Sequence, residues 1–437
     1  MTRIGSRFAR VEPRRRVAAF LQGLLAGLPR ANCWSIAEHA AELGPQGMQR
    51  LLSRAVWDTD GVRDDLRDYV VEHLGHPDAV LVIDETGDLK KGSATVAVQR
   101  QYTGTAGRVE NSQVAVYLAY ANPSIPAGYA LIDRALYLPR CWAEDPDRCR
   151  AAGVPAEVGF ATKPALAGQM LSRVLQAGAP AAWLTGDEVY GADPRLRAQA
   201  AATGLGYVLA VAKDHRIVTG IGPRRAVDLA VRLPERCWQR ISAGPGAKGP
   251  RVYDWALIDT TDPAVPDQAA GPHWLLIRRA ISTGEYAFYR AHAPHPVTLT
   301  ELVRVAGTRW KIEEGFAGSK ELAALDQHQV RGWTSWHRWT LLAMLAHAFL
   351  SVLTATQPSD PDTDPGADPA HDRSGRLIPL TRNEIRRLFT GLLTRPIPAR
   401  LQLHWSRWRR RHQAIARAGH YRRRTETLED HEVLLEY

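Results

Sequence analysis

The sequence Ala-Val-Leu-Val-Ile-Asp-Glu-Thr-Gly occupies residues 79–87, and its apolar run ends at Asp84. An uninterrupted apolar run of this length is typical of a buried strand. A second run, Ala181–Thr185, ends at Gly186 and Asp187. Both carboxylates are therefore expected directly after a buried strand.

The segments around these two strands alternate between strand and helix patterns. Further strands are expected at Ala94–Tyr102, Gln113–Tyr120 and Tyr207–Val211, and helices at Lys163–Gln176 and Pro194–Thr203. Alternation of this kind predicts an α/β domain with a mixed central sheet.

The chain changes character on either side of this α/β segment. Residues 14–76 show helical periodicity with short breaks, as a helix-turn-helix module does and as any small helical bundle does. Residues 217–296 contain short strand patterns separated by Gly, Pro and Asp turns, which predicts a β-rich insertion. Helical periodicity returns near Leu302 and again over Ser335–Ala355.

A chain of 437 residues is expected to form two or three domains. Residues 357–374 contain five aspartates and four prolines and almost nothing apolar, so a disordered linker is expected there. The predicted division is a helical N-terminal domain over 1–76 that is a candidate for DNA binding, an α/β core over 77–216 and 297–356, the β-rich insertion over 217–296, the linker over 357–374 and a basic C-terminal region over 375–437.

The positive charge is concentrated near the C-terminus. The chain has 56 basic and 46 acidic residues, a net charge of +10. Residues 373–424 hold 15 arginines and one acid, Glu384, a net charge of +14, so the rest of the chain sums to −4. An anionic polymer is the expected partner, although a solvated basic tail has the same composition.

Within the basic region, tryptophan is interleaved with arginine over Trp405–His412. This pattern combines apolar docking with phosphate contacts, so DNA binding is expected here, with an affinity that falls steeply with salt. The arginines predicted to contact DNA are Arg407, Arg409, Arg410, Arg411, Arg422 and Arg423.

Composition excludes several other classes of protein. Hydrophobic residues make up 45% of the chain and charged residues 23%, which is ordinary for a soluble globular protein. No uncharged apolar run reaches 18 residues, so no membrane span is expected. The four cysteines form no CxxC pair, which argues against a thiol zinc site and favours a reducing, cytoplasmic compartment.

The two acids at the strand ends are candidate metal ligands. Carboxylates that follow neighbouring strands of an α/β sheet lie at one edge and can face each other. Such a pair repels itself unless a cation lies between the two groups. Oxygen ligands with open coordination positions suit Mg²⁺ or Mn²⁺, so Asp84 and Asp187 are expected to bind one of these ions.

A third acid is available on the helix expected from Leu302 to about Ala324. Arg309 and Glu313 are four positions apart and Glu313 and Lys320 are seven apart, so the three lie near one helix face. An acid between two cations suits a site that handles phosphates, although a surface ladder of salt bridges has the same spacing. The spacing to both cations selects Glu313 over its neighbour Glu314.

Residues adjacent to these acids are expected to have ordinary roles. Glu85, Glu188 and Glu314 are assigned to the surface or to structural contacts, the alternative being that they support the candidate metal ligands beside them. Trp310 is expected in the core rather than as a platform for base stacking, and His347, among apolar neighbours, is expected to be a core histidine whose ring nitrogens are hydrogen-bonded.

The ordered combination of these pieces resembles the insertion-sequence DDE transposases, in the group with a Y-x2-R-x3-E-x6-K signature and a β insertion before the catalytic glutamate. The gap of 126 positions between Asp187 and Glu313 also fits, and the resemblance covers roughly residues 79–355. The matching pieces are the strand ending at Val82–Thr86, the turn Gly186–Gly191, and Arg309 with Trp310, Ile312, Glu313 and Lys320.

The resemblance departs from the signature at one position. The signature's tyrosine falls at position 306, where this chain has Ala306. A hydroxyl that contacts phosphate in relatives is therefore missing, while all three acids are present.

The resemblance implies an RNase H-like catalytic core in which Asp84, Asp187 and Glu313 hold two divalent ions, Mg²⁺ or Mn²⁺. In two-metal phosphoryl transfer one ion activates water or a 3′-hydroxyl and the other stabilises the leaving oxygen. Arg309 and Lys320 are expected to grip DNA phosphates near the cleaved bond.

The implied function is that of a cut-and-paste DNA transposase. Such an enzyme binds the terminal inverted repeats of its element in double-stranded DNA, cleaves at their ends and joins them to target DNA. Synapsis of two ends requires at least a homodimer, and the expected location is the bacterial cytoplasm at the nucleoid, without a membrane. The alternative is a domesticated transposase that keeps the fold, no longer cuts and acts as a DNA-binding regulator.

Overall fold

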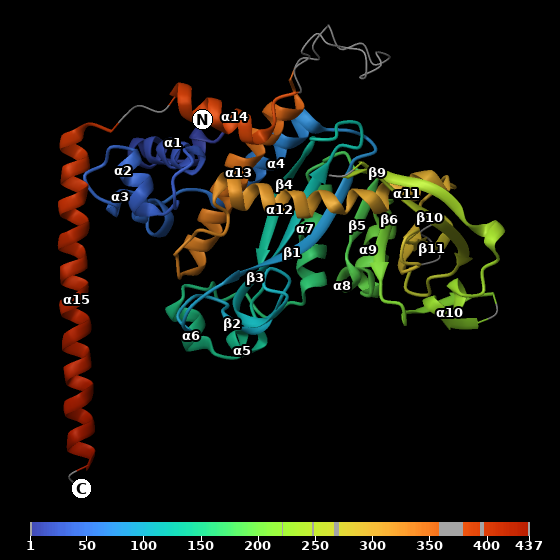
Figure 1. Cartoon of the computed structure of the whole chain (residues 1–437). Coiled ribbons are helices and arrows are strands. Elements are labelled where there is room, and N and C mark those ends of the chain that lie inside the picture. Colours follow the sequence, from blue (N-terminus) through green and yellow to red (C-terminus); the bar gives the residue numbers. More distant parts are fainter. Residues whose placement is uncertain are drawn as a thin grey trace.

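A computed structural model of the chain describes residues 2–220, 222–246, 249–265, 271–357, 379–393 and 397–435 (Figure 1). Of the expected linker over 357–374, only Gln357 lies within the described residues. The other predicted segments can be compared with the structure.

The centre of the structure is a mixed sheet with the strand order β4-β3-β1-β5-β6. The strands β4, β3 and β1 pair antiparallel, whereas β1, β5 and β6 pair parallel. This arrangement is the RNase H-like one that the resemblance implies. The bounds are β1 Val80–Leu89, β3 Arg108–Ala121, β4 Tyr129–Leu136, β5 Trp183–Gly186 and β6 Gly206–Val211.

The β-rich segment extends this sheet. Strand β12 (Tyr286–His292) pairs antiparallel with β6, and β11 (His273–Arg279), β10 (Gly249–Thr260) and β9 (Gln239–Gly246) follow in order. The free edge of β6 is thereby covered by strand pairing. The hairpin of β7 (Arg216–Thr219) and β8 (Gly222–Arg225) forms a separate two-stranded sheet.

Strand β2 occupies Gln99–Thr103 and pairs with β3. The strand pattern over Ala94–Tyr102 therefore predicted its position only in part, because Thr95, Val96 and Ala97 lie in a turn. Strand β3 is longer than predicted, since it also pairs with β2 and with the distal half of β1.

Helices surround the sheet (Figure 1). Short polar side chains start several of them: the Asp58 carboxylate accepts from the Gly61 amide at the start of α4, and Thr162 caps α7. Their bounds are α1 Val11–Leu25, α2 Cys33–His39, α3 Gln46–Ser53, α4 Thr59–Leu74, α5 Arg140–Ala143, α6 Pro146–Ala151, α7 Lys163–Gln176, α8 Glu188–Gly191, α9 Pro194–Ala202, α10 Ala226–Ala230, α11 Leu299–Thr308, α12 Trp310–Ala323, α13 Trp333–Ala355, α14 Arg382–Leu393 and α15 Ala399–Leu435, with short 3-10 helices at Gly5–Arg7 and Glu235–Cys237.

The helix expected from Leu302 to about Ala324 is divided in two. Arg309 ends α11 and precedes α12, with φ −50° and ψ −36°. Because this conformation is still helical, the face shared by Arg309, Glu313 and Lys320 is retained across the junction.

Helix α13 crosses the interior of the protein. Within the described residues, it is long and apolar enough to span a membrane by length and composition, with a mean hydropathy of 1.4, although no span was expected. Of this apolar window, 72% is buried inside the protein, as in a core helix. Trp336 and Trp339 on α13 share one buried cluster with Phe20 of α1 and Val82 of β1, so the N-terminal helices and the sheet pack around a common core.

Helix α15 stands beside the body of the protein, with its N-terminal end near α2 and α3 (Figure 1). The indole of Trp405 is buried and donates to the Glu42 carbonyl oxygen at 2.9 Å. Trp408 packs edge-on against Trp34, with ring centroids 4.8 Å apart. The two tryptophans therefore dock the basic helix, as the interleaved pattern suggested.

Candidate active site

Asp84 lies within β1, where its parallel neighbour ends. The parallel pairing with β5 stops at Ile83 and Gly186, whereas the antiparallel pairing with β3 continues to Leu89. The prediction that the strand ends before Asp84 was therefore wrong, because the long strand β3 pairs with β1 well beyond the apolar run. Asp84 is nonetheless at the carboxyl edge of the parallel strands, where α/β sheets place their sites.

Asp187 follows β5 and caps the short helix α8. Its carboxylate accepts a hydrogen bond from the Val189 amide at 2.9 Å. At the other end of α8, a Cβ on Gly191 would lie 1.8 Å from the Ala210 carbonyl oxygen of β6. Only glycine permits this close approach of α8 to the sheet, which holds Asp187 near β1.

The carboxylates of Asp84, Glu85 and Asp187 each offer an oxygen, and these atoms lie within 4.8 Å of one another. Burial and the charge of Asp187 raise the pKa of Asp84 to about 7, although the Glu85 amide and Arg309 oppose the shift. Burial and the charge of Glu85 raise the pKa of Asp187. A set of clustered acidic oxygens that repel one another fits a divalent ion such as Mg²⁺ or Mn²⁺.

Glu85 was assigned to a surface or structural role by the sequence, yet it belongs to this cluster. Neighbouring strand residues normally point to opposite faces of a sheet, so the sequence held no signal beyond adjacency to Asp84. Its carboxylate accepts from Lys163 Nζ at 2.6 Å and from the Tyr190 hydroxyl at 2.5 Å.

Glu313 reaches the cluster through Arg309. The Arg309 guanidinium donates to Glu313 Oε1 at 2.8 Å and lies 3.5 Å from Asp84 Oδ2. Among the described residues, the acids within 4.8 Å of one another are Asp84, Glu85 and Asp187, so Glu313 is separated from them by a cation.

Lys320 lies beside the same strand. Its ammonium donates to the Thr86 hydroxyl at 2.8 Å. Arg309 and Lys320 therefore contact β1 at Asp84 and Thr86, on either side of Glu85 in the sequence.

A cavity of about 1250 Å³ adjoins Asp187 between the insertion strands and helices α11 and α12. Its wall includes Arg251, Arg278 and Arg309 and the aromatic rings of Tyr253, Tyr289 and Trp310. Trp310 is 45% exposed, so its expected place in the core was wrong. Ala306 lines the same cavity, which places the missing tyrosine of the signature at this wall.

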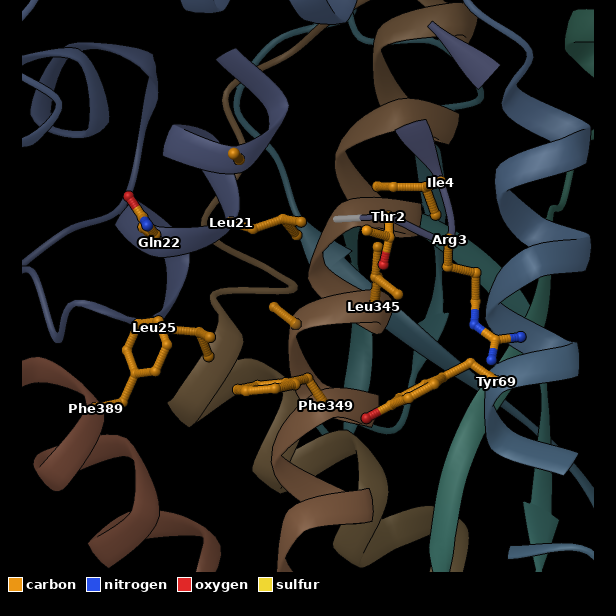
Figure 2. A pocket seen from close by; sticks show the side chains of 12 residues that line it. Thr2, Arg3, Ile4, Leu21, Gln22, Leu25, Tyr69, Leu345, Phe349 and Phe389 are labelled. Atoms are coloured by element: carbon orange, nitrogen blue, oxygen red, sulfur yellow. The ribbon is translucent and has the colours of Figure 1, made fainter. Parts of the chain in front are cut away.

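A second cavity, of about 500 Å³, lies among α1, α4, α13 and α14 (Figure 2). Leu21, Leu25, Phe349 and Phe389 line it, and no acid is among its lining residues. His347, on the same helix α13, is fully buried as expected, but neither of its ring nitrogens has a hydrogen-bond partner among the described residues, so the expectation that they are satisfied was wrong.

The arginines predicted to bind DNA on α15 differ in their surroundings. Arg409 is ion-paired with Glu38 of α2, so it fastens the helix to the body. The exposed members are Arg407, Arg410, Arg411, Arg422 and Arg423. They follow or flank the docked tryptophans along the helix.

Comparison with known proteins identifies a matching family and individual similar proteins. Residues 5–227 match the family model described as DDE superfamily endonuclease. The chain is 27% identical over 258 residues to a probable transposase for insertion sequence element IS701 from Microchaete diplosiphon, a match that covers 56% of this chain and 62% of the relative's length. The NurA nuclease from Sulfolobus solfataricus aligns over 57% of this chain and 81% of its own, with 10% identity and a TM-score of 0.26.

Proposed function

Because this chain belongs to the DDE superfamily endonucleases, we propose that it is the transposase of an insertion sequence element and works by cut-and-paste. In this proposal it binds the terminal inverted repeats of its element, cleaves at their ends and transfers them to target DNA. The observation that carries the proposal is the group of carboxylate oxygens from Asp84, Glu85 and Asp187 at the carboxyl edge of the parallel strands. Glu313 lies next to this group, because the Arg309 guanidinium contacts both Asp84 and Glu313.

Asp84, Asp187 and Glu313 are the residues that would hold two Mg²⁺ or Mn²⁺ ions. When bound, such ions supply an activated water or 3′-hydroxyl and stabilise the leaving oxygen. The side chains of the protein set the charges that surround this site. Arg309 offsets the repulsion between Asp84 and Glu313, and Lys320 places an ammonium beside β1 for a phosphate of the bound DNA.

Two surfaces support DNA binding. The cavity beside Asp187 brings Arg251, Arg278 and Trp310 to a wall next to the acids, which suits a DNA end held for cleavage. The arginines of α15 lie on a helix that extends away from the body, which suits contacts with a longer stretch of duplex (Figure 1). The active complex would be a homodimer that holds two element ends, acting on DNA in the bacterial cytoplasm at the nucleoid.

The first test is strand cleavage of a duplex that carries the DNA flanking this gene, in Mg²⁺ and in Mn²⁺. The unaltered chain is expected to cut at the element boundary, and Glu313→Gln is expected to lower the rate at least about 100-fold, because it removes an anionic ligand of the proposed metal site. Glu321→Gln, an exposed carboxylate on the same helix α12, is the matched control and should cut normally. Equal cutting by Glu313→Gln would contradict its role as a ligand.

The competing function is a DNA-binding regulator that does not cut. Ala306 favours it, because a phosphate-contacting hydroxyl is missing from the cavity beside Asp187. Binding of the flanking duplex without cleavage in either metal, with both ends present, would replace the transposase proposal with this one.

The arginines of α15 make a separate prediction about salt. The double variant Arg410→Ala/Arg411→Ala is expected to make the dependence of log affinity on log salt shallower by about 2, since each phosphate contact contributes about 0.9. The measurement is fluorescence anisotropy with a duplex between 50 and 200 mM salt, about the range over which such contacts dominate affinity. Arg150→Ala, an exposed arginine of α6, is the control, and an unchanged slope in the double variant would show that α15 makes no phosphate contacts.

A further inference from the structure

Lys163 places an ammonium group against the acid cluster. Its Nζ lies 2.6 Å from Glu85 Oε1, and the two side chains are 23% and 18% exposed. The contact joins the first residue of α7 to strand β1, 78 positions away in the sequence. Lys163 is not part of the signature that the sequence matched.

The two partners of Glu85 differ in burial. Tyr190, whose hydroxyl donates to Glu85 Oε2, is fully buried on α8. The Lys163 side chain is partly exposed, and its ammonium lies at the end of a flexible four-carbon chain. The ammonium can therefore move away from Glu85 while α7 stays in place, because the Thr162 cap holds the start of that helix. The Tyr137 ring, 6.0 Å from Nζ, offers the departed ammonium a second partner.

An ammonium and a divalent ion compete for the same acidic cluster. The Lys163 charge offsets part of the repulsion among Asp84, Glu85 and Asp187 in the metal-free chain. A divalent ion among these oxygens supplies more charge, and it repels an ammonium that stays within a few ångströms. Binding of the ion therefore favours release of Lys163 from Glu85.

We propose that Glu85 is a further ligand of the metal site and that Lys163 is its internal counter-ion, displaced when the divalent ion binds. The inference rests on the proposed function, since it assumes that Asp84 and Asp187 hold the metal. It assigns Glu85, which the three-acid signature leaves out, a direct part in metal binding and gives Tyr190 the role of orienting its carboxylate.

The test is a titration of the DNA-free, full-length chain with Mn²⁺, followed by calorimetry and by the electron paramagnetic resonance of free Mn²⁺. Glu85→Gln is expected to weaken Mn²⁺ binding about 10-fold or more, as loss of an oxygen ligand or its close support does. Lys163→Met is expected to tighten Mn²⁺ binding several-fold, since a competing positive charge is removed. Lys163→Arg keeps the charge, so its affinity is expected to stay near that of the unaltered chain.

The controls use a second lysine–glutamate pair outside the cluster. Lys311 Nζ lies 3.0 Å from Glu314 Oε2, with side chains 23% and 38% exposed, so Lys311→Met and Glu314→Gln should leave Mn²⁺ affinity unchanged. If Asp84→Asn loses Mn²⁺ binding while Glu85→Gln and Lys163→Met bind as the unaltered chain does, the inference fails and the metal site stands. If Asp84→Asn also binds Mn²⁺ normally, the metal site itself, and with it the proposed function, fails.

Discussion

The Asp84→Asn chain is expected to lose strand cleavage, by at least about 100-fold, and to become more stable than the unaltered chain. Asp84 is buried among acids, and this burial together with the charge of Asp187 raises its pKa to about 7. An unfolded aspartate titrates near about 3.9. Ionised Asp84, which the reaction needs, therefore lowers the free energy of unfolding.

The sign of the pH dependence follows from these two pKa values. Between about pH 4 and pH 7 the folded chain binds the Asp84 proton more tightly than the unfolded chain, so stability falls as the pH rises through this window and stays low above it. Asparagine has no such charge. In metal-free buffer the variant should gain roughly 2 to 4 kcal/mol at pH 8, and the gain should shrink toward zero near pH 4.

The measurement is urea unfolding in EDTA at the two pH values, with cleavage in Mg²⁺ followed in parallel. Asp88→Asn, on the same strand, is a control of opposite sign. Burial, the largest single influence, opposes ionisation of Asp88, but the hydrogen bond from His328 at 2.9 Å and the positive charges nearby, Lys90 and Lys320 among them, together lower the Asp88 pKa. Asp88→Asn should therefore destabilise the chain at pH 8. An Asp84→Asn chain that is less stable than the unaltered one at pH 8 would contradict the argument.

Arg197→Met is expected to destabilise the fold by about 3 to 5 kcal/mol, the usual cost of leaving one partner of a buried ion pair alone. Arg197 Nε lies 2.6 Å from Asp262 Oδ2, and the two side chains are 5% and 2% exposed. Asp262 lies just after β10 and Arg197 lies in α9, so the pair ties the insertion to the core. Its loss leaves the Asp262 carboxylate with the more distant Arg290 guanidinium, at 3.5 Å, and with the weaker hydrogen bonds from the Tyr207 hydroxyl and the Ala264 amide.

The same variant is expected to slow cleavage. A second nitrogen of the Arg197 guanidinium donates to the Gly191 carbonyl oxygen at 2.7 Å, at the end of the helix that Asp187 begins. Without this contact α8 is held less firmly, and the position of Asp187 depends on α8. Arg197 is thus a positioning residue rather than one that contacts DNA or metal.

The measurement is denaturant unfolding of Arg197→Met, of Asp262→Leu and of the double variant. The double variant should recover only part of the loss, because it removes both charges of the pair but takes the Asp262 carboxylate away from Arg290. Arg225→Met removes an exposed pair with Asp228 at 2.8 Å and should cost less than about 1 kcal/mol. A loss of similar size in Arg197→Met would mean that the buried pair contributes little.

The sequence pattern was sufficient to predict the features that depend on residues close together in the sequence. The apolar runs before Asp84 and Asp187 predicted β1 and β5, because a strand buried on both faces must be apolar throughout. The spacing of Arg309, Glu313 and Lys320 predicted one face of α12, because helical geometry depends on sequence separation alone. The interleaved tryptophans predicted a docked basic helix.

Other features could not be predicted from the sequence, because they depend on contacts between segments that are distant along the chain. Strand β1 runs past Asp84 because β3, a distant segment, pairs with it as far as Leu89. The insertion continues the central sheet because the edge of β6 needed a partner and β12 provides it. Trp310 is exposed because a cavity, rather than the core, lies against its side of α12.

The sequence by itself selected Asp84, Asp187 and Glu313 as candidate ligands and determined the α/β core that carries Asp84 and Asp187. Only the tertiary structure decided that Glu85 joins the cluster, that Arg309 stands between Asp84 and Glu313, and that Lys163 faces the acids from 78 positions away. The physical reason is that repulsion among buried carboxylates must be offset by whichever cations the packing brings near, and packing joins residues without regard to their distance along the chain.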